Sequence, residues 1–326
     1  MVPAAEFRSY YGRPILKPPV WTHDVAAYLF TGGLAAGSSL LAAGGDLTGR
    51  PRLRRAGRGV AMAALLTSTG LLVKDLGRPE RFLNMLRVAK PTSPMSMGTW
   101  ILTVYGAAAG VAATAEMSSA AGDRLGPVGR LTARAGRPAG LVAAAVAPGL
   151  ATYTAVLLAD TAVPSWHEAH RQLPFLFAGS ALASGAGVGL LAAGPSDVGP
   201  ARRLAVLGAA TELAGARSVR HTMGLLSEPY LTGRPGRLLQ AGEVLTVVGV
   251  GGAMLGGRSR VVRSASGTCL LGASLATRFG IFEGGVASTK DPRYLVLPQR
   301  ERLAERQRTQ TVTPSGREGT SSPTTG

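Results

Sequence analysis

Long apolar stretches separated by short basic or polar loops constrain the fold of this chain more than any other feature. A helix of about 20 predominantly apolar residues is long enough to cross a bilayer. The sequence therefore predicts eight spans, at about residues 20–43, 59–73, 97–115, 139–159, 173–193, 202–216, 238–255 and 261–276. The sixth is the weakest, because it carries Glu212 and is soon followed by Arg217 and Arg220. We expect an all-α integral membrane protein whose eight helices form two four-helix bundles.

These spans divide the chain into three parts: a polar segment at 1–19, a membrane domain at 20–288, and a tail at 289–326 that is charged and then expected to be disordered. A signal peptide is the alternative for the first span, but its apolar run approaches the length of a true span. An even number of spans puts both termini on the same side of the membrane. We expect that membrane to be the cell membrane, that is, the inner or cytoplasmic membrane. Arginines are more numerous in the loops after odd-numbered spans, so the positive-inside rule predicts that both termini lie outside.

The composition excludes one class of partner that the charge alone would suggest. The formal net charge is +17, yet 46% of the residues are hydrophobic and only 16% are charged. The basic residues gather between the apolar runs, as expected for the loops of a membrane protein. No interleaving of aromatic and basic residues is visible, so the sequence does not predict a nucleic-acid partner. The 45 glycines are typical of membrane helices that pack closely.

Few residues could bind a metal. Cys269 is the only cysteine, which excludes a cluster of cysteines for iron–sulfur ligation within this chain. None of the four histidines is predicted to lie in mid-membrane opposite another, so we expect no haem. His167 and Glu168 are adjacent in a loop, but two residues do not make a metal site, and we predict none.

One polar insertion, residues 74–100, interrupts the apolar pattern with KDLGRPERFLNMLRVAKPTSPMSMGTW. Its charges are too dense for unpaired burial, so we expect it to lie on a membrane face as a lid. Asp75 and Arg78 or Arg81 would form an ion pair there, or take part in a proton path.

Polar residues near one membrane face form a candidate site. His23, Asp24 and Tyr28 begin the first span, and Tyr153 lies near the end of the fourth. The helical rise of ~1.5 Å per residue places all four at a similar depth on the outer face. Such a set suits a quinol headgroup, whose two hydroxyls need hydrogen bonds and lose protons on oxidation. The alternatives are interface anchors and, for Asp24, a helix cap.

Other ionisable residues within or near the spans have two possible roles. Glu212 and Glu243 could pair with Arg217 or Arg237, or could line a proton path. Arg278, at the end of the eighth span, belongs to the same group.

Several motifs together carry a resemblance to a known family. They are WTHDVAAYLFTGG, DLGRPERF, FLNMLR, KPTSPMSMGTW, PGLATYTAVLLADTAVPSW, SEPYLTGRPGRLL, RFGIFEGGVASTKDPRY and PQRERL. Over about residues 10–305 the chain resembles the membrane subunits of polysulfide reductase, the NrfD family. The resemblance implies a haem-free core of eight helices that exchanges electrons between menaquinone or ubiquinone and a ferredoxin-like iron–sulfur subunit. That subunit in turn serves a molybdopterin catalytic subunit.

The resemblance also implies roles for single residues. In the family the quinone site uses polar residues at the start of the first helix and a tyrosine in the fourth, which here are His23, Asp24 or Tyr28, and Tyr153. The iron–sulfur partner would dock on the lid, the loop at 160–171 and the C-terminal segment, with contacts from Phe82, Trp166 and His167. The chain would not act alone on the terminal substrate. A secondary transporter and a purely structural anchor are the alternatives, although no internal repeat supports transport.

Overall fold

The computed structural model of this chain describes residues 15–75, 78, 80, 84–121, 126–194, 196–256 and 259–312. Every regular element in these ranges is helical, and none is a strand. The α-helices and 3-10 helices are α1 (His23–Leu47), α2 (Pro51–Asp75), α4 (Pro94–Ala121), α5 (Gly126–Ala159), α6 (Pro164–Glu168), η3 (Ala169–Arg171), α7 (Leu173–Ala192), α8 (Gly199–Thr222), η4 (Gly224–Ser227), α9 (Glu228–Leu231), α10 (Gly233–Leu255), α11 (Arg260–Ser288) and α12 (Arg293–Val312).

Six helices in the described part of the chain are long and apolar enough to cross a membrane: α1, α2, Pro94–Ser119 of α4, Arg134–Ala159 of α5, α7 and α10. This confirms an all-helical, multi-pass membrane protein. Helices α8 and α11, where the sequence predicts spans six and eight, are long enough but more polar. Helix α11 also continues to Ser288, well beyond the predicted end of its span at residue 276.

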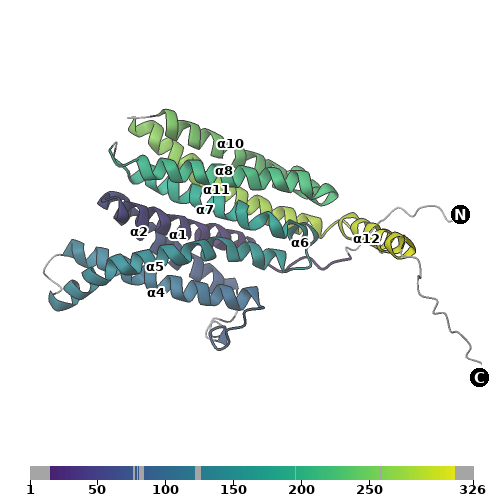
Figure 1. Cartoon of the computed structure of the whole chain (residues 1–326), viewed down its shortest axis with the longest axis horizontal. Helices are drawn as coiled ribbons and strands as arrows, with labels where there is room; N and C mark the ends of the chain where they lie inside the picture. The colour runs from purple at the N-terminus through teal and green to yellow at the C-terminus, as the bar shows by residue number, and fades with distance from the viewer. Residues whose placement is uncertain are drawn as a thin grey trace, which may run out of the picture.

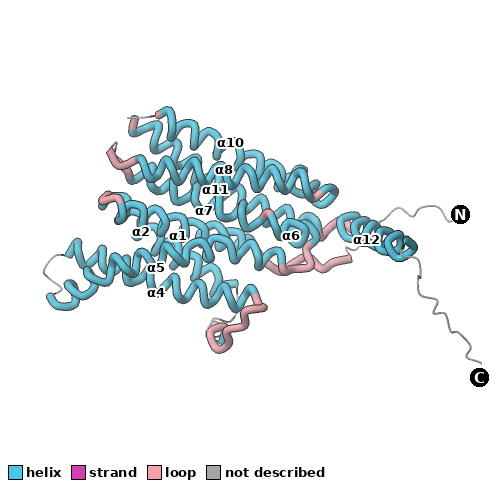
Figure 2. The backbone as a smooth tube through the Cα atoms, viewed as in Figure 1, coloured by secondary structure: helices cyan, strands magenta, loops and turns pink. Residues whose placement is uncertain are grey.

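The long helices pack as pairs of sequence neighbours, α1 with α2, α4 with α5, α7 with α8, and α10 with α11. The first two pairs form one group and the last two form the other, as Figure 1 shows. Figure 2 shows that short loops join most of these helices. Helices α1 and α7 are the most buried of the six candidate spans, and they join the two groups at the centre.

Glycine allows this central contact. Gly37 of α1 lies against Ala181 and Gly185 of α7, and a Cβ atom added at Gly37 or Gly185 would overlap the facing backbone. Close backbone approach through small residues is a usual way for membrane helices to pack. The AAGSS and ASGAG segments of the two helices therefore fix how the two groups meet.

The two ends of the molecule differ. At one end, here called the α12 end, α1 begins, α11 ends, and α6 and α12 lie beside them (Figure 1). Glu168 of α6 accepts a hydrogen bond from Arg302 of α12 at 3.0 Å. Part of the predicted tail is thus a helix, since α12 begins at Arg293, and residues 313–326 lie outside the described ranges.

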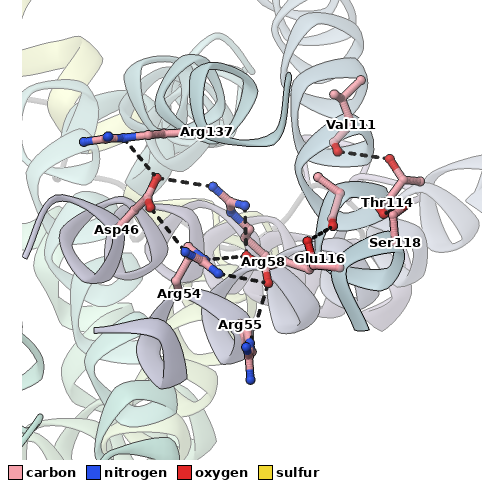
Figure 3. A network of polar contacts seen from close by, with 11 residues as sticks. Asp46, Arg54, Arg55, Arg58, Val111, Thr114, Glu116, Ser118 and Arg137 are labelled. Atoms are coloured by element: carbon pink, nitrogen blue, oxygen red, sulfur yellow. Dashed lines mark hydrogen bonds and ion pairs between the residues drawn. The ribbon is translucent and has the colours of Figure 1, made fainter. Parts of the chain in front are cut away.

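The opposite end, here called the arginine end, is held by the ion-pair network of Figure 3. Glu116 of α4 accepts hydrogen bonds from Arg54 and from Arg58 of α2, the latter at 2.9 Å. Asp46 of α1 lies 3.4 Å from Arg58 and 3.6 Å from Arg54. The predicted second span begins at about residue 59, but α2 already begins at Pro51. The predicted start was wrong because Arg54 and Arg58, which precede it, are neutralised by carboxylates on other helices.

Candidate functional site

A pocket opens at the α12 end, within the group formed by α1, α2, α4 and α5. Its polar side chains are few: Tyr28 of α1, Asp75 of α2, Thr99 of α4 and Tyr153 of α5. The remaining lining is mostly apolar and comes from Trp21, Val25, Leu71, Leu72, Met85, Met95, Gly98, Leu102 and Leu157. The pocket encloses about 680 Å³ of empty space, counting its open mouth. An apolar cavity with a few convergent polar groups is the usual form of a small-molecule site.

Tyr153 owes its position to a glycine on the neighbouring helix. Its ring is 8% exposed and lies directly on Gly98 of α4, where any Cβ atom would overlap the aromatic carbons. The glycine belongs to the MSMGTW motif that ends the polar segment 74–100. This explains why a segment with a predicted surface location contributes to the wall of an internal pocket.

The two phenol groups of the pocket share an unusual property. Tyr28 is 6% exposed, and within the described residues neither Tyr28 nor Tyr153 makes a side-chain hydrogen bond. A buried phenol normally finds a partner, because leaving its hydroxyl unpaired costs free energy. Both hydroxyls are therefore available to a ligand in the pocket.

The polar segment closes on itself beside the pocket. The Ser96 hydroxyl donates to the carbonyl oxygen of Val88 at 2.9 Å and accepts from the backbone nitrogen of Lys90 at 2.9 Å. The Trp100 indole nitrogen also donates to Val88, at 3.5 Å. These bonds fix the return of the chain into α4, and so the positions of Met95 and Gly98 on the pocket wall.

The structure separates the four residues predicted to bind quinone. Tyr28 and Tyr153 line the pocket, whereas His23 and Asp24 do not. Asp24 lies in the first turn of α1 and forms an ion pair of 2.9 Å with Lys74 at the end of α2. The cap of α1 is Thr22, whose hydroxyl accepts from the Asp24 backbone nitrogen. Asp24 thus ties two helices together at the rim of the pocket.

His23 faces a second cavity between the start of α1, the start of α10 and the end of α11. Its Nε2 atom lies 3.2 Å from Oε1 of Glu283. The other carboxylate oxygen of Glu283, Oε2, lies 3.3 Å from Nε of Arg234. Trp21 lines both cavities and therefore forms part of the wall between them. Sequence reasoning missed Glu283. An acid in the apolar run GIFEGG was the available signal, but the predicted end of span eight left it outside the membrane.

Three predicted ionisable residues lie in the other helix group, away from the pocket. Glu212 is 3% exposed and accepts hydrogen bonds from Thr277 at 2.7 Å and Thr246 at 3.4 Å. Arg278 is fully buried, donates to the Phe177 carbonyl oxygen at 2.7 Å and stacks over the Phe177 ring. These buried charges are held by α7, α8, α10 and α11 together.

Neither acid takes the arginine partners that the sequence suggested. Glu243 pairs with Arg220 at 2.6 Å, and not with Arg217 or Arg237. Glu212 forms no ion pair within the described residues and has hydroxyl partners instead.

The remaining predicted residues have varied positions. Arg78 is exposed and makes no ion pair with Asp75 within the described residues, while Arg81 and Phe82 lie outside them. Trp166 is fully buried and donates from its indole nitrogen to the Ile281 carbonyl oxygen at 2.9 Å. It therefore belongs to the core. Of the two predicted docking residues that the structure describes, only His167 is exposed. In the described part of the chain, no three His, Cys, Asp or Glu side chains gather in a metal-binding arrangement.

A comparison with known families decides the identity. Residues 15–196 match the family described as polysulphide reductase, NrfD. The chain belongs to the NrfD family. No curated protein matches it significantly.

The NrfD match covers α1 to α7, and so all the residues that line the first pocket. It ends before α8, whereas the motifs discussed above suggested a resemblance to about residue 305. The NrfD-matched half therefore contains the two phenol groups, and the unmatched half contains the buried Glu212 and Arg278.

Proposed function

We propose that this NrfD-family chain is the haem-free membrane subunit of a molybdopterin-dependent oxidoreductase. It exchanges electrons between the membrane pool of menaquinone or ubiquinone and an iron–sulfur partner subunit. The observation that carries the proposal is the apolar pocket with the free phenol groups of Tyr28 and Tyr153, which lies inside the NrfD-matched residues.

The shape and chemistry of this pocket suit a quinol ring. A flat, largely apolar ring with two oxygens needs an apolar cavity and hydrogen-bonding groups for those oxygens. The Tyr28 and Tyr153 hydroxyls supply the hydrogen bonds, and the leucine and methionine side chains supply the apolar contact. Oxidation of the quinol releases two electrons and two protons. The electrons pass to the iron–sulfur partner, because the chain has only one cysteine and cannot bind a cluster by itself.

Asp75 is the pocket group best placed to accept a proton. Its carboxylate lines the pocket at the end of α2, is exposed to solvent, and makes no ion pair within the described residues. A carboxylate at the mouth can take a proton from the substrate and pass it to water. Asp24 forms its ion pair with Lys74 at the end of α2, and His23 faces the second cavity. We propose that both help to release protons at this end of the molecule.

The buried charges of the second helix group support eight membrane crossings in two four-helix bundles. Glu212 and Arg278 make α8 and α11 polar by composition, yet both side chains point into the bundle and away from lipid. A helix whose charged side chains are buried inside the bundle can cross a bilayer. Eight crossings would put both termini on one side, and the excess of arginines in the loops after odd-numbered spans favours the outer side. We propose that Glu212, Glu243 and Arg278 hold this group together or conduct protons through it.

The iron–sulfur partner would dock at the α12 end, close to the pocket. His167 and the α12 helix are exposed there, and the Glu168–Arg302 hydrogen bond fixes α12 to α6. We propose that Phe82 contributes to the same surface. Trp166 would support it from beneath, since its ring packs against Trp21 and Phe282.

The test is the quinol-dependent reduction of the co-purified partner by wild type, Tyr28→Phe and Tyr153→Phe. Each substitution removes one hydroxyl and leaves the ring, so the fold should persist. Loss of one hydrogen bond to the substrate should lower kcat/KM by about tenfold.

Tyr230→Phe is the matched control. The Tyr230 hydroxyl is also buried and has no hydrogen-bond partner among the described residues. Burial raises the pKa of its phenol, and Tyr230 lies outside the pocket. Its removal should leave kcat/KM unchanged. If all three variants match wild type, the pocket does not bind quinol, and a structural anchor is the better account.

A further inference from the structure

A third hollow lies on the surface of the second helix group, and none of its residues lines the pocket proposed for quinol chemistry. It is a groove between the start of α7 and the second half of α8. Its residues are Arg171, Gln172, Phe175, Ala210, Thr211, Ala214, Gly215, Ser218 and Thr222. All of them lie within the described ranges. We propose that this groove binds an anionic phospholipid.

Arg171, Gln172 and Thr222 form the polar end of the groove. Arg171 is exposed and makes no ion pair within the described residues. The neighbouring Gln172 amide donates to the Thr222 hydroxyl at 2.8 Å, which joins the start of α7 to the end of α8. An arginine beside hydroxyl groups at the level of the helix ends is well suited to a phosphate oxygen.

Below this polar end the groove is apolar and lined by small side chains. Phe175, which is 65% exposed, lines this part of the groove together with Ala210, Ala214 and Gly215. Thr211 directs its hydroxyl to the Leu207 carbonyl oxygen at 2.8 Å, so its methyl group can face an apolar ligand. A large aromatic ring on such a surface costs nothing in a membrane, because lipid chains cover it.

The dimensions fit one acyl chain. Thr222 and Ala210 are twelve residues apart on α8, which corresponds to ~18 Å at ~1.5 Å per residue. The groove thus runs from the headgroup level well into the hydrocarbon layer, which is ~30 Å thick in total. The arginine at the polar end would bind the phosphate of the lipid, and the apolar part of the groove would take one of its acyl chains. A free phosphate would use only the polar end.

The experiment measures the phosphatidylglycerol that stays bound to the purified complex, by native mass spectrometry after exchange into detergent. Arg171→Gln removes the cation, and Ala214→Leu places a larger side chain in the groove. Arg171→Gln should lower retention by about fivefold, the factor expected for one arginine acting on an anionic headgroup. Ala214→Leu should also lower retention, because its side chain takes up space in the groove. Ala214 lies outside both the quinol pocket and the loop at 160–171, so the quinol-dependent activity of Ala214→Leu should stay at the wild-type level, and a failure here does not bear on the quinol pocket.

Two controls separate this site from general lipid binding. Arg203→Gln removes an exposed arginine at the other end of α8, and Ala63→Leu enlarges an exposed alanine on α2. Both should retain lipid as wild type does. Added inorganic phosphate should not displace the lipid, and phosphatidylcholine should bind less well. Equal retention in Ala214→Leu and wild type, or displacement by inorganic phosphate alone, would overturn the proposal.

Discussion

In the first helix group, the carboxylates of the arginine end form ion pairs, whereas the phenol groups that line the pocket at the α12 end have no hydrogen-bond partner among the described residues. At the arginine end, Asp46 and Glu116 are each held by several arginines, and Figure 3 shows that the contacts tie α1, α2, α4 and α5 together. At the α12 end, the Tyr28 and Tyr153 hydroxyls have no partner within the described residues, and both residues line an open pocket. Polar groups that hold the fold are paired with one another, and those proposed to bind substrate are left available.

The difference follows from what each end must do. A buried guanidinium such as Arg58 costs free energy unless carboxylates neutralise it, so the arginine end must be closed and rigid. A substrate site needs the reverse, because groups already paired inside the protein cannot bond a ligand without losing those bonds. Substitutions at the arginine end should therefore change stability, and substitutions around the pocket should change activity.

The largest effect should come from removing both acids of the arginine end. The double variant Asp46→Asn, Glu116→Gln leaves Arg58, which is 7% exposed, without a carboxylate partner. Breaking a buried pair from one side costs about 3–5 kcal/mol, so the thermal unfolding temperature of the purified complex should fall sharply. The folded fraction should still oxidise quinol at the wild-type rate.

The matched control at that end is Arg55→Gln. Arg55 is largely exposed and lies 3.8 Å from Glu116, so its loss should cost only about 0–1 kcal/mol. A double variant that melts together with wild type would show that the network does not hold this end, and the contrast between the two ends would fail.

The next effect concerns the wall of the pocket. Gly98→Ala adds a methyl group that overlaps the Tyr153 ring, so the ring must move. We expect a cost of about 1–3 kcal/mol in stability from overpacking. Because the hydroxyl is displaced, kcat/KM for quinol should fall about as far as in Tyr153→Phe, roughly tenfold.

Gly110→Ala on the same helix is the control, because a Cβ atom added there meets nothing within 4 Å. It should be neutral or slightly stabilising, since alanine favours a helix over glycine. Gly98→Ala with full activity would mean that the position of the Tyr153 ring does not matter for the reaction.

The sequence predicted where most helices lie along the chain. It did not predict which side chains of different helices face one another. Apolar runs indicate where helices lie, and their rise placed Tyr28 and Tyr153 at one depth, as the shared pocket requires. The face on which a residue lies depends on the angle around the helix. His23 is five positions before Tyr28 and therefore about 140° away around α1, which turns it toward Glu283 on α11.

Contacts between residues that are far apart in the sequence explain the other differences between the predictions and the structure. The basic run at 49–58 is typical of a loop when taken alone, yet Arg58 finds Glu116 at a separation of 58 residues in the chain. Likewise, the buried Glu212 is satisfied by hydroxyls from α10 and α11. Charge density in a single sequence cannot reveal such partners, because they come from other helices.

The smallest effect should come from the ion pair at the rim of the pocket. Asp24→Asn removes the charge that faces Lys74, but both side chains are partly open to water. An exposed pair of this kind is screened by salt, so we expect only a slight fall in melting temperature, which high salt should abolish. If Asp24 also helps to release protons, kcat for quinol oxidation should fall while KM stays constant, and high salt should not restore it. Lys74→Gln breaks the same pair without removing the carboxylate. Equal losses of kcat in the two variants would assign Asp24 to holding the rim, and a loss confined to Asp24→Asn would assign it to proton transfer.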